Sequence, residues 1–234
     1  MKLYTYLYLV TACLVLACSK SEDNSFEYKY AYYPLQKASW IIYSVDSIVH
    51  TENGQLVKHD TFHFQVKELI DSSFIGLDNE FYWQFSVFSR MDSVSPWSNQ
   101  RIGLVKRTIT TVQRDFNGIN LIKLVFPPNK DYSWNTNVFN NESKNSELID
   151  SICLFKEIDQ PLKLGKFSFD SSLTVLQSDY EDLINKGYAE EKYVKNVGMV
   201  YKKMLELGKQ NASNPWSMPE TGYDVTYTIW DFKK

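Results

Sequence analysis

The sequence predicts a mainly β protein whose antiparallel sheet is curled as a barrel, a half-barrel or a sandwich. Its 16 Tyr, 14 Phe and 6 Trp make up 15% of the chain, and aromatic residues favour pleated, half-buried surfaces. Runs of β-forming residues alternate with turn residues, whereas few windows place apolar residues at helical spacing. So many short strands would leave sheet edges exposed, and a curled sheet can close or cover them.

The first predicted hairpin lies near the start of this series. Residues 40–49 are rich in β-branched and aromatic side chains, and residues 61–67 alternate between apolar and polar positions. Asn53-Gly54 lies between the two runs, and this dipeptide is the strongest short signal for a two-residue hairpin turn. We therefore expect two adjacent antiparallel strands joined near Gly54.

The later strands are predicted from the same signals. Residues 81–88 alternate between two faces, and Asn117-Gly118 indicates a second hairpin between residues 102–112 and 119–126. Four further strands are expected at residues 148–155, 173–177, 193–207 and 223–232.

Helical structure is expected to be limited to one or two short segments. Ser178 to Glu181 resembles a capping box, and Gly187 could end a short helix over residues 179–186. A hairpin that extends the neighbouring strand fits the same residues.

The first 17 residues have the features of a cleaved export signal. Met1-Lys2 supplies a positive start, and residues 3–17 are uncharged and largely apolar. This stretch is shorter than the ~20 residues that a helix needs to cross a bilayer. A cleaved signal therefore fits better than a permanent span, and an uncleaved signal anchor is the alternative.

The leader ends in Leu14-Val15-Leu16-Ala17-Cys18, which resembles the lipobox of bacterial lipoproteins. In that family the signal is cut before the cysteine, whose thiol and new amino group receive fatty acids. The resemblance therefore implies a signal peptide over residues 1–17 and a lipid anchor on Cys18. Several acyl chains hold a protein firmly, because each buried CH₂ contributes about 0.8 kcal/mol.

A second match to the lipobox ends at Cys13. Cleavage there would leave a very short apolar region in the leader and an apolar start to the mature chain. We therefore favour Cys18.

The segment after the anchor is predicted to be flexible. Residues 18–30 form the lipidated cysteine and a polar tether, and residues 31–234 form a single β-rich domain with no clear internal linker. Lys20 followed by Glu22-Asp23 resembles the surface-export signal of Bacteroidetes lipoproteins, although a solvated linker fits the same residues. We expect the protein in the cell envelope, anchored in the outer membrane on its periplasmic face or at the cell surface.

Two further segments are similar to a group of uncharacterised Bacteroidetes lipoproteins. Residues 33–48 share the group's opening of an aromatic residue, Pro and Leu, then Trp and a strand, with Ala38 near the expected Gly. Residues 191–202 are similar to a late motif of the group, in which Gly198 is kept and Asn196 replaces an earlier Gly. The resemblance implies a β-rich surface or periplasmic lipoprotein, and it implies no activity.

Composition and charge exclude some partners. The chain is 44% hydrophobic and 23% charged, as in ordinary globular proteins. Loss of Lys2 with the leader leaves 24 of the 25 basic residues against 28 acidic ones, a net charge of −4. This balance argues against nucleic acid as a partner, because nucleic acid requires clustered Lys and Arg.

Cysteine usage predicts no disulfide within the mature chain. If Cys13 leaves with the leader and Cys18 is lipidated, Cys153 is the one remaining thiol. It lies in the apolar run of residues 151–155, where a buried, small hydrophobic side chain is the favoured interpretation.

No catalytic, metal or cofactor site is predicted. The sequence contains no nucleophile elbow, zinc-protease motif, phosphate-binding loop or Cys-x-x-Cys pair. His59 and His63 are four residues apart on one predicted strand, roughly 13 Å, which is too far for two ligands of one metal. His50 could approach His59 across the hairpin, but solvated histidines are the favoured interpretation.

Four tryptophans are the candidates for ligand stacking. Trp97 and Trp216 lie in Pro-Trp-Ser loops, and Trp83 and Trp134 lie in or beside polar stretches. Exposed aromatic rings of this kind could stack on sugars or anchor a protein partner, although they could also cap the ends of a barrel core.

The sequence therefore predicts a lipid-anchored, non-catalytic binding or structural module of the cell envelope. Its expected partners are the membrane, through the N-terminal lipid, and a glycan, lipid or protein ligand. In one form of this binding function, a half-barrel holds a hydrophobic or lipid ligand in its interior. The alternative function is a cell-surface hydrolase or carbohydrate-handling protein.

Overall fold

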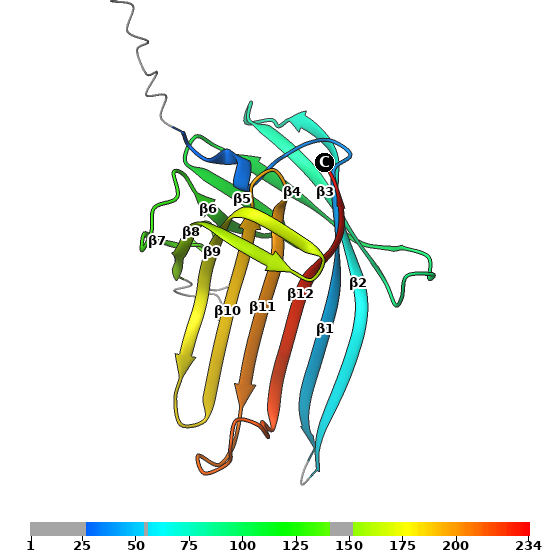
Figure 1. The fold of residues 1–234 in the computed structure, drawn as a ribbon, viewed down its shortest axis with the longest axis vertical. Helices are drawn as coiled ribbons and strands as arrows, with labels where there is room; N and C mark the ends of the chain where they lie inside the picture. Colours follow the sequence, from blue (N-terminus) through cyan, green and yellow to red (C-terminus); the bar gives the residue numbers. More distant parts are fainter. Residues whose placement is uncertain (1–26, 54–55, 141–151) are drawn as a thin grey trace, which may run out of the picture.

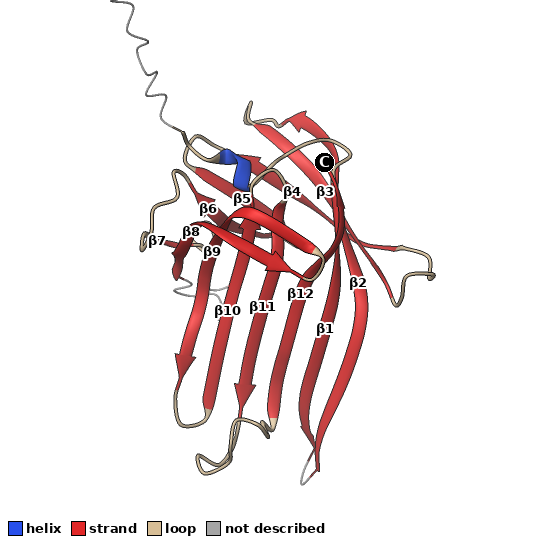
Figure 2. Ribbon diagram, in the orientation of Figure 1, coloured by secondary structure: helices blue, strands red, loops and turns tan. Residues whose placement is uncertain are grey.

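A single antiparallel sheet of twelve strands runs through the computed structural model, which describes residues 27–53, 56–140 and 152–234 (Figure 1). The strands are β1 (Trp40–Asn53), β2 (Leu56–Ile75), β3 (Phe81–Arg90), β4 (Ser98–Arg107), β5 (Thr111–Phe116), β6 (Ile119–Val125), β7 (Ser133–Asn135), β8 (Ile152–Leu164), β9 (Phe167–Glu181), β10 (Asn185–Val194), β11 (Gly198–Gly208) and β12 (Thr221–Lys233). Their order across the sheet is β6-β5-β4-β3-β2-β1-β12-β11-β10-β9-β8-β7. Among the described residues, the one helical element is the 3-10 turn η1 (Tyr30–Tyr32) (Figure 2).

The two end strands approach each other and nearly close a barrel. The backbone N–H of Ile122 on β6 donates to the carbonyl of Thr136, just after β7, at 2.9 Å. The carbonyl of Ile122 accepts hydrogen bonds from Trp134 Nε1 at 3.0 Å and from Thr136 Oγ1 at 2.8 Å. These bonds occupy edge groups that would otherwise be open to pairing with another chain. The predicted curled antiparallel sheet is confirmed, in its barrel form.

Both predicted hairpins are confirmed as pairs of adjacent antiparallel strands. β1 and β2 pair as far as Asn53 and Leu56, and residues 54–55 between them lie outside the described residues. Asn117 and Gly118 join β5 to β6 with φ angles of 57° and 76°. Positive φ at both central residues is what a turn matched to the twist of the strands requires.

Two predicted strands are each interrupted by a turn. The segment 102–112 divides at Thr108, whose Oγ1 accepts the N–H of Thr111 at 2.9 Å. The segment 193–207 divides at Asn196, which adopts a left-handed φ of 62°. The single-strand predictions were wrong because side-chain capping and a left-handed Asn reverse the chain without an obvious break in β-forming composition.

The predicted short helix over residues 179–186 is also wrong, and its hairpin alternative is confirmed. β9 continues to Glu181, and Asp182 Oδ1 then accepts the N–H groups of Ile184 and Asn185 at 2.8 and 2.7 Å. The turn that follows β9 is therefore held by Asp182, the residue after the predicted capping box of Ser178 to Glu181. Of the predicted strand 148–155, residues 148–151 lie outside the described residues.

The main core fills the inside of the barrel. Its buried members include Tyr43, Val66, Phe85 and Phe155, and Tyr32 of η1 covers one end. A second cluster lies on the opposite face of the sheet, since Val194 alternates with Tyr193 of the main core. There the ends of β8 and β9 fold as a hairpin across β10, β11 and β12 (Figure 1).

Six strands continue beyond the closed part of the barrel. β3 pairs with β2 only from Gln65 onward, and β8 pairs with β9 only as far as Leu176. The remaining ends of β1, β2, β9, β10, β11 and β12 form a sheet of their own, which we call the extension (Figure 1). The extension comprises residues 46–53, 56–64, 177–181, 185–190, 203–208 and 221–226.

Candidate functional site

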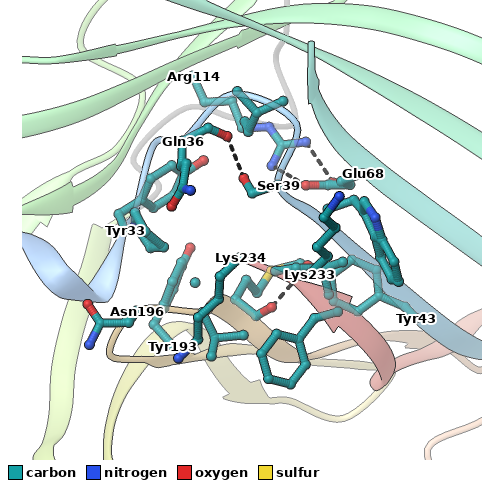
Figure 3. Close-up of a pocket in the computed structure, with 18 residues that line it drawn as sticks. Tyr33, Gln36, Ser39, Tyr43, Glu68, Arg114, Tyr193, Asn196, Lys233 and Lys234 are labelled. Carbon is teal, nitrogen blue, oxygen red and sulfur yellow. Dashed lines mark hydrogen bonds and ion pairs between the residues drawn. The ribbon is translucent and has the colours of Figure 1, made fainter.

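A pocket opens at the end of the barrel that carries the C-terminus, away from the extension (Figures 1 and 3). Tyr33, Tyr43 and Tyr193 line it, and Asn196 of the β10–β11 turn and Lys233 stand at its side. The space open to the centre of a water-sized molecule is about 80 Å³. One water needs about 10–15 Å³ of such space, so the pocket holds several waters or a very small ligand.

An ion pair forms one wall of this pocket. Arg114 donates to both carboxylate oxygens of Glu68, at 3.1 and 2.8 Å, and its guanidinium lies 4.1 Å from the ring of Phe85 (Figure 3). Burial would lower the pKa of Arg114, but the adjacent Glu68 carboxylate raises this pKa above its ordinary value. The Arg114 guanidinium therefore stays charged, and its two hydrogen bonds to Glu68 satisfy both carboxylate oxygens.

A second charged cluster lies deeper in the barrel, around Glu191. The Glu191 side chain is 1% exposed and accepts hydrogen bonds from Lys123 Nζ at 2.7 Å and from the Tyr193 hydroxyl at 2.5 Å. Lys202 Nζ lies 3.6 Å from the same carboxylate. Burial acts to raise the pKa of Glu191, but the two lysines and the tyrosine outweigh it and lower the pKa to about 2.

The inner face of the extension continues the face that forms the main core. Phe62 of β2 lies two positions before Phe64 and four before Val66, so all three side chains point to one side of the strand. Residues paired directly across strands share a face. The register gives one row of Phe62, Ser47, Val225, Met204 and Ala189, and a second row of Asp60, Val49, Tyr223, Glu206, Gly187 and Tyr180.

Large aromatic side chains remain uncovered on this inner face. Phe62 is 46% exposed, Tyr180 is 43% exposed and Tyr223 is 41% exposed. Tyr180 lies flat over Gly187, where an added Cβ would come within 2.2 Å of the ring. The glycine therefore lets the ring lie close to the sheet, where its hydroxyl donates to Glu206.

The outer face of the same strands is polar and internally paired. His63 Nδ1 lies 2.5 Å from Asp46, and Lys203 lies 2.5 Å from Asp224. His50 and His59 meet across the β1–β2 hairpin, with their Nδ1 atoms 2.6 Å apart, as the sequence suggested. Among the residues that the structure describes, no group of three or more His, Cys, Asp or Glu side chains is placed to hold a metal ion.

The four predicted stacking tryptophans lie on four different elements. Trp134 of β7 is buried against Phe155 in the main core, and Trp83 of β3 is partly buried beside Phe81. Trp97 lies in the β3–β4 loop and Trp216 in the β11–β12 loop.

The two loop tryptophans are covered in part by cations. The Arg90 guanidinium lies 4.2 Å from the ring centre of Trp97, and Lys209 Nζ lies 4.4 Å from that of Trp216. Ligand stacking on these residues stays a prediction. The sequence reasoning missed the inner-face tyrosines and the buried charges, because only the register shows that they share a surface.

Cys153 is buried in the main core, beside Trp134 and Phe155. Burial raises the pKa of its thiol from 9.0 to about 11. A thiol with this environment is a packing residue with little nucleophilic character at neutral pH. Cys18 and the leader lie outside the described residues, so the lipid anchor also stays a prediction.

The fold and the site define an all-β protein with a nearly closed antiparallel barrel and a two-faced extension. No helix in the described part of the chain is both long enough and apolar enough to span a membrane. No family model matches the chain, and no curated protein matches its sequence.

Two solved structures show some likeness to the chain. One is a protein from Bacteroides fragilis, described as exported and as having a YmcC-like fold, with 12% identity and a TM-score of 0.39. The other is a protein from Parabacteroides distasonis, described as a lipoprotein, with 9% identity and a TM-score of 0.32. Each comparison covers 86% of this chain and 98% of the other. Likenesses of this degree establish neither a family nor an activity.

Proposed function

We propose that the protein is a lipid-anchored, non-catalytic binding protein of the bacterial outer membrane that holds an amphiphilic molecule against the inner face of the extension. The two faces of the extension carry this proposal. An antiparallel sheet ordinarily packs its apolar face on a core and presents its polar face to water. In the extension the outer face is polar and ion-paired, whereas the inner face leaves Phe62, Tyr180 and Tyr223 more than two-fifths exposed.

The shape of the inner face favours a ligand with a long apolar part. The row from Phe62 to Ala189, which is apolar apart from Ser47, runs across five strands, and neighbouring strands are about 4.8 Å apart. Such a surface removes a hydrocarbon chain from water without requiring specific polar contacts. The small pocket at the other end of the barrel has no room for such a chain.

The barrel interior gives less support to the hydrolase alternative. Glycoside hydrolysis needs a carboxylic acid whose pKa is raised towards neutrality. Glu191 has its pKa lowered to about 2, and Glu68 is held in a bidentate ion pair with Arg114. Glu191 is therefore not prepared to donate a proton, and both oxygens of Glu68 are occupied by Arg114.

The lipid anchor is tested by the mass of the native N-terminus. We expect a mature chain that begins at acylated Cys18, and we expect Cys18→Ser to move the protein out of the membrane fraction. Acylation at Cys13 would keep the anchor but shift the cleavage site. An intact Met1, or an acyl-free Cys18 in a freely dispersed product, would remove the anchor from the proposal.

Ligand binding is tested with the anchored full chain in phosphatidylcholine vesicles and a photoreactive long-chain alcohol. Phe62→Asp is expected to raise the half-saturating probe concentration about tenfold or more. Burial of a Phe side chain is worth roughly 1.5–3 kcal/mol, and each 1.4 kcal/mol changes the dissociation constant by a factor of ten. The new carboxylate would also lie on an apolar surface. The readout is the labelling of peptides from β11 and β12, measured by mass spectrometry.

Thr61→Asp is the matched control, because Thr61 directly precedes Phe62 on β2 and points to the outer face. It should change the half-saturating concentration less than twofold. Equal weakening by both substitutions, or no labelling of the inner-face peptides in the wild type, would contradict binding at this face.

A further inference from the structure

The charged groups inside the barrel do not balance. Arg114 is paired with Glu68 through two hydrogen bonds, and Lys123 is paired with Glu191 at 2.7 Å. Lys202 lies 3.6 Å from the Glu191 carboxylate that Lys123 already occupies. An N–H···O bond between opposite charges is usually 2.7–2.9 Å long, so Lys202 is close to the carboxylate without a hydrogen bond to it. In this cluster of described residues, one cation has no carboxylate of its own.

Lys202 lies where the barrel interior meets the inner face of the extension. In the register it pairs with Tyr227 and Glu191, and the next inward residue on β11 is Met204. Its side chain is 26% exposed, so part of it faces the open inner surface. Burial lowers the pKa of Lys202, Glu191 raises it, and the nearby Lys123 and Arg114 lower it further. A second anion here would therefore be stabilising.

The charges along the inner face also set a direction. The second row, farther from the barrel, carries Glu206 and also Asp60, which is paired with Lys58. Glu206 would repel an anionic group at that end, and the cluster around Lys202 would attract it. From Met204 on β11 to Phe62 on β2 the row crosses three strand-to-strand intervals of about 4.8 Å each, so this path is about 14 Å long. That length suits an extended long acyl chain.

We propose that the ligand of the inner face is a long-chain fatty acid anion, whose carboxylate accepts hydrogen bonds from Lys202 and whose chain lies over Met204, Val225 and Phe62. This inference rests on the proposed function and adds the charge of the ligand and its orientation. A carboxylate matches the positive charge that Glu191 leaves unmatched on Lys202. A zwitterionic lipid would bring its own cation beside Lys202 and Lys123, where it would be repelled.

The test compares two photoreactive probes of equal chain length, a dodecanoate and the corresponding dodecanol, on the anchored full chain in phosphatidylcholine vesicles. The wild type is expected to show a preference for the acid over the alcohol, measured as the ratio of half-saturating concentrations. Lys202→Met is expected to reduce this ratio about tenfold, because a charge-assisted hydrogen bond to a carboxylate is lost. The use of a ratio removes differences in how the two probes enter the vesicle membrane.

Lys203→Met is the matched control. Lys203 follows Lys202 on β11 but points to the outer face, where it pairs with Asp224. It should leave the ratio unchanged, and Lys202→Arg should keep most of the preference. An unaltered ratio in Lys202→Met, or an equal loss in Lys203→Met, would overturn the fatty acid assignment while leaving amphiphile binding intact. Failure of both probes to label the inner face of the wild type would instead overturn the proposed function itself.

Discussion

Glu191→Leu is expected to lower the free energy of unfolding by about 3–5 kcal/mol, the usual cost of removing one partner from a buried ion pair. The substitution would leave the Lys123 ammonium, now bonded to Glu191 at 2.7 Å, without a carboxylate inside the barrel. It would also remove the acceptor of the Tyr193 hydroxyl. Urea denaturation at pH 7 measures the loss.

Two further variants separate the loss of charge pairing from a general effect of mutation. Asp60→Asn removes the carboxylate of a more exposed pair with Lys58 and should cost less than about 1 kcal/mol. Lys123→Met combined with Glu191→Leu should recover part of the stability, because it removes the uncompensated cation. A single Glu191 variant as stable as the Asp60 variant would contradict the role assigned to this cluster.

The same carboxylate makes stability depend on acid pH. The pKa of Glu191 is about 2 in the folded protein, below its ordinary value of 4.5. A group whose pKa is lowered by folding stabilises the protein above the unfolded pKa. This contribution is therefore complete above pH 4.5 and is lost as the pH falls from about 4.5 towards 2. Glu191→Leu should flatten this part of the stability profile.

Phe155→Ala is expected to destabilise the protein by about 3–5 kcal/mol, as truncation of a buried Phe does when the core cannot collapse around the cavity. Phe155 is 0% exposed, and its ring centre lies 4.6 Å from that of Trp134. Its backbone N–H also donates to Tyr132, so the residue lies where β7 and β8 meet near the closure of the barrel. Thermal and urea unfolding of the variant measure the effect.

Ile152→Ala on the same strand is the comparison. Ile152 is 50% exposed, so its truncation leaves no enclosed cavity and should cost about 1 kcal/mol or less. Similar losses in the two variants would show that the interior at Phe155 is not closely packed, and the barrel closure would then need another explanation.

Much of the sheet could be predicted because strands and tight hairpins are local features. The two Asn-Gly signals and the alternation of apolar residues were sufficient for β1, β2 and β6. The turns at Thr108 and Asn196 were missed, because each depends on one side chain or one left-handed residue within a run of β-forming residues. The candidate site could not be predicted, since Lys123 and Glu191 are 68 residues apart and meet only when β6 and β10 face each other across the barrel.

The local pattern of residues was enough to predict a curled antiparallel sheet and to show which residues share a face of each strand. On β2 it placed Phe62 and Val66 on the same side, because side chains alternate with a period of two. The closure of the barrel buries Val66, whereas Phe62 remains 46% exposed. The physical reason is that β3 pairs with β2 no farther than Gln65, so the barrel encloses one residue and leaves the other on an uncovered apolar face.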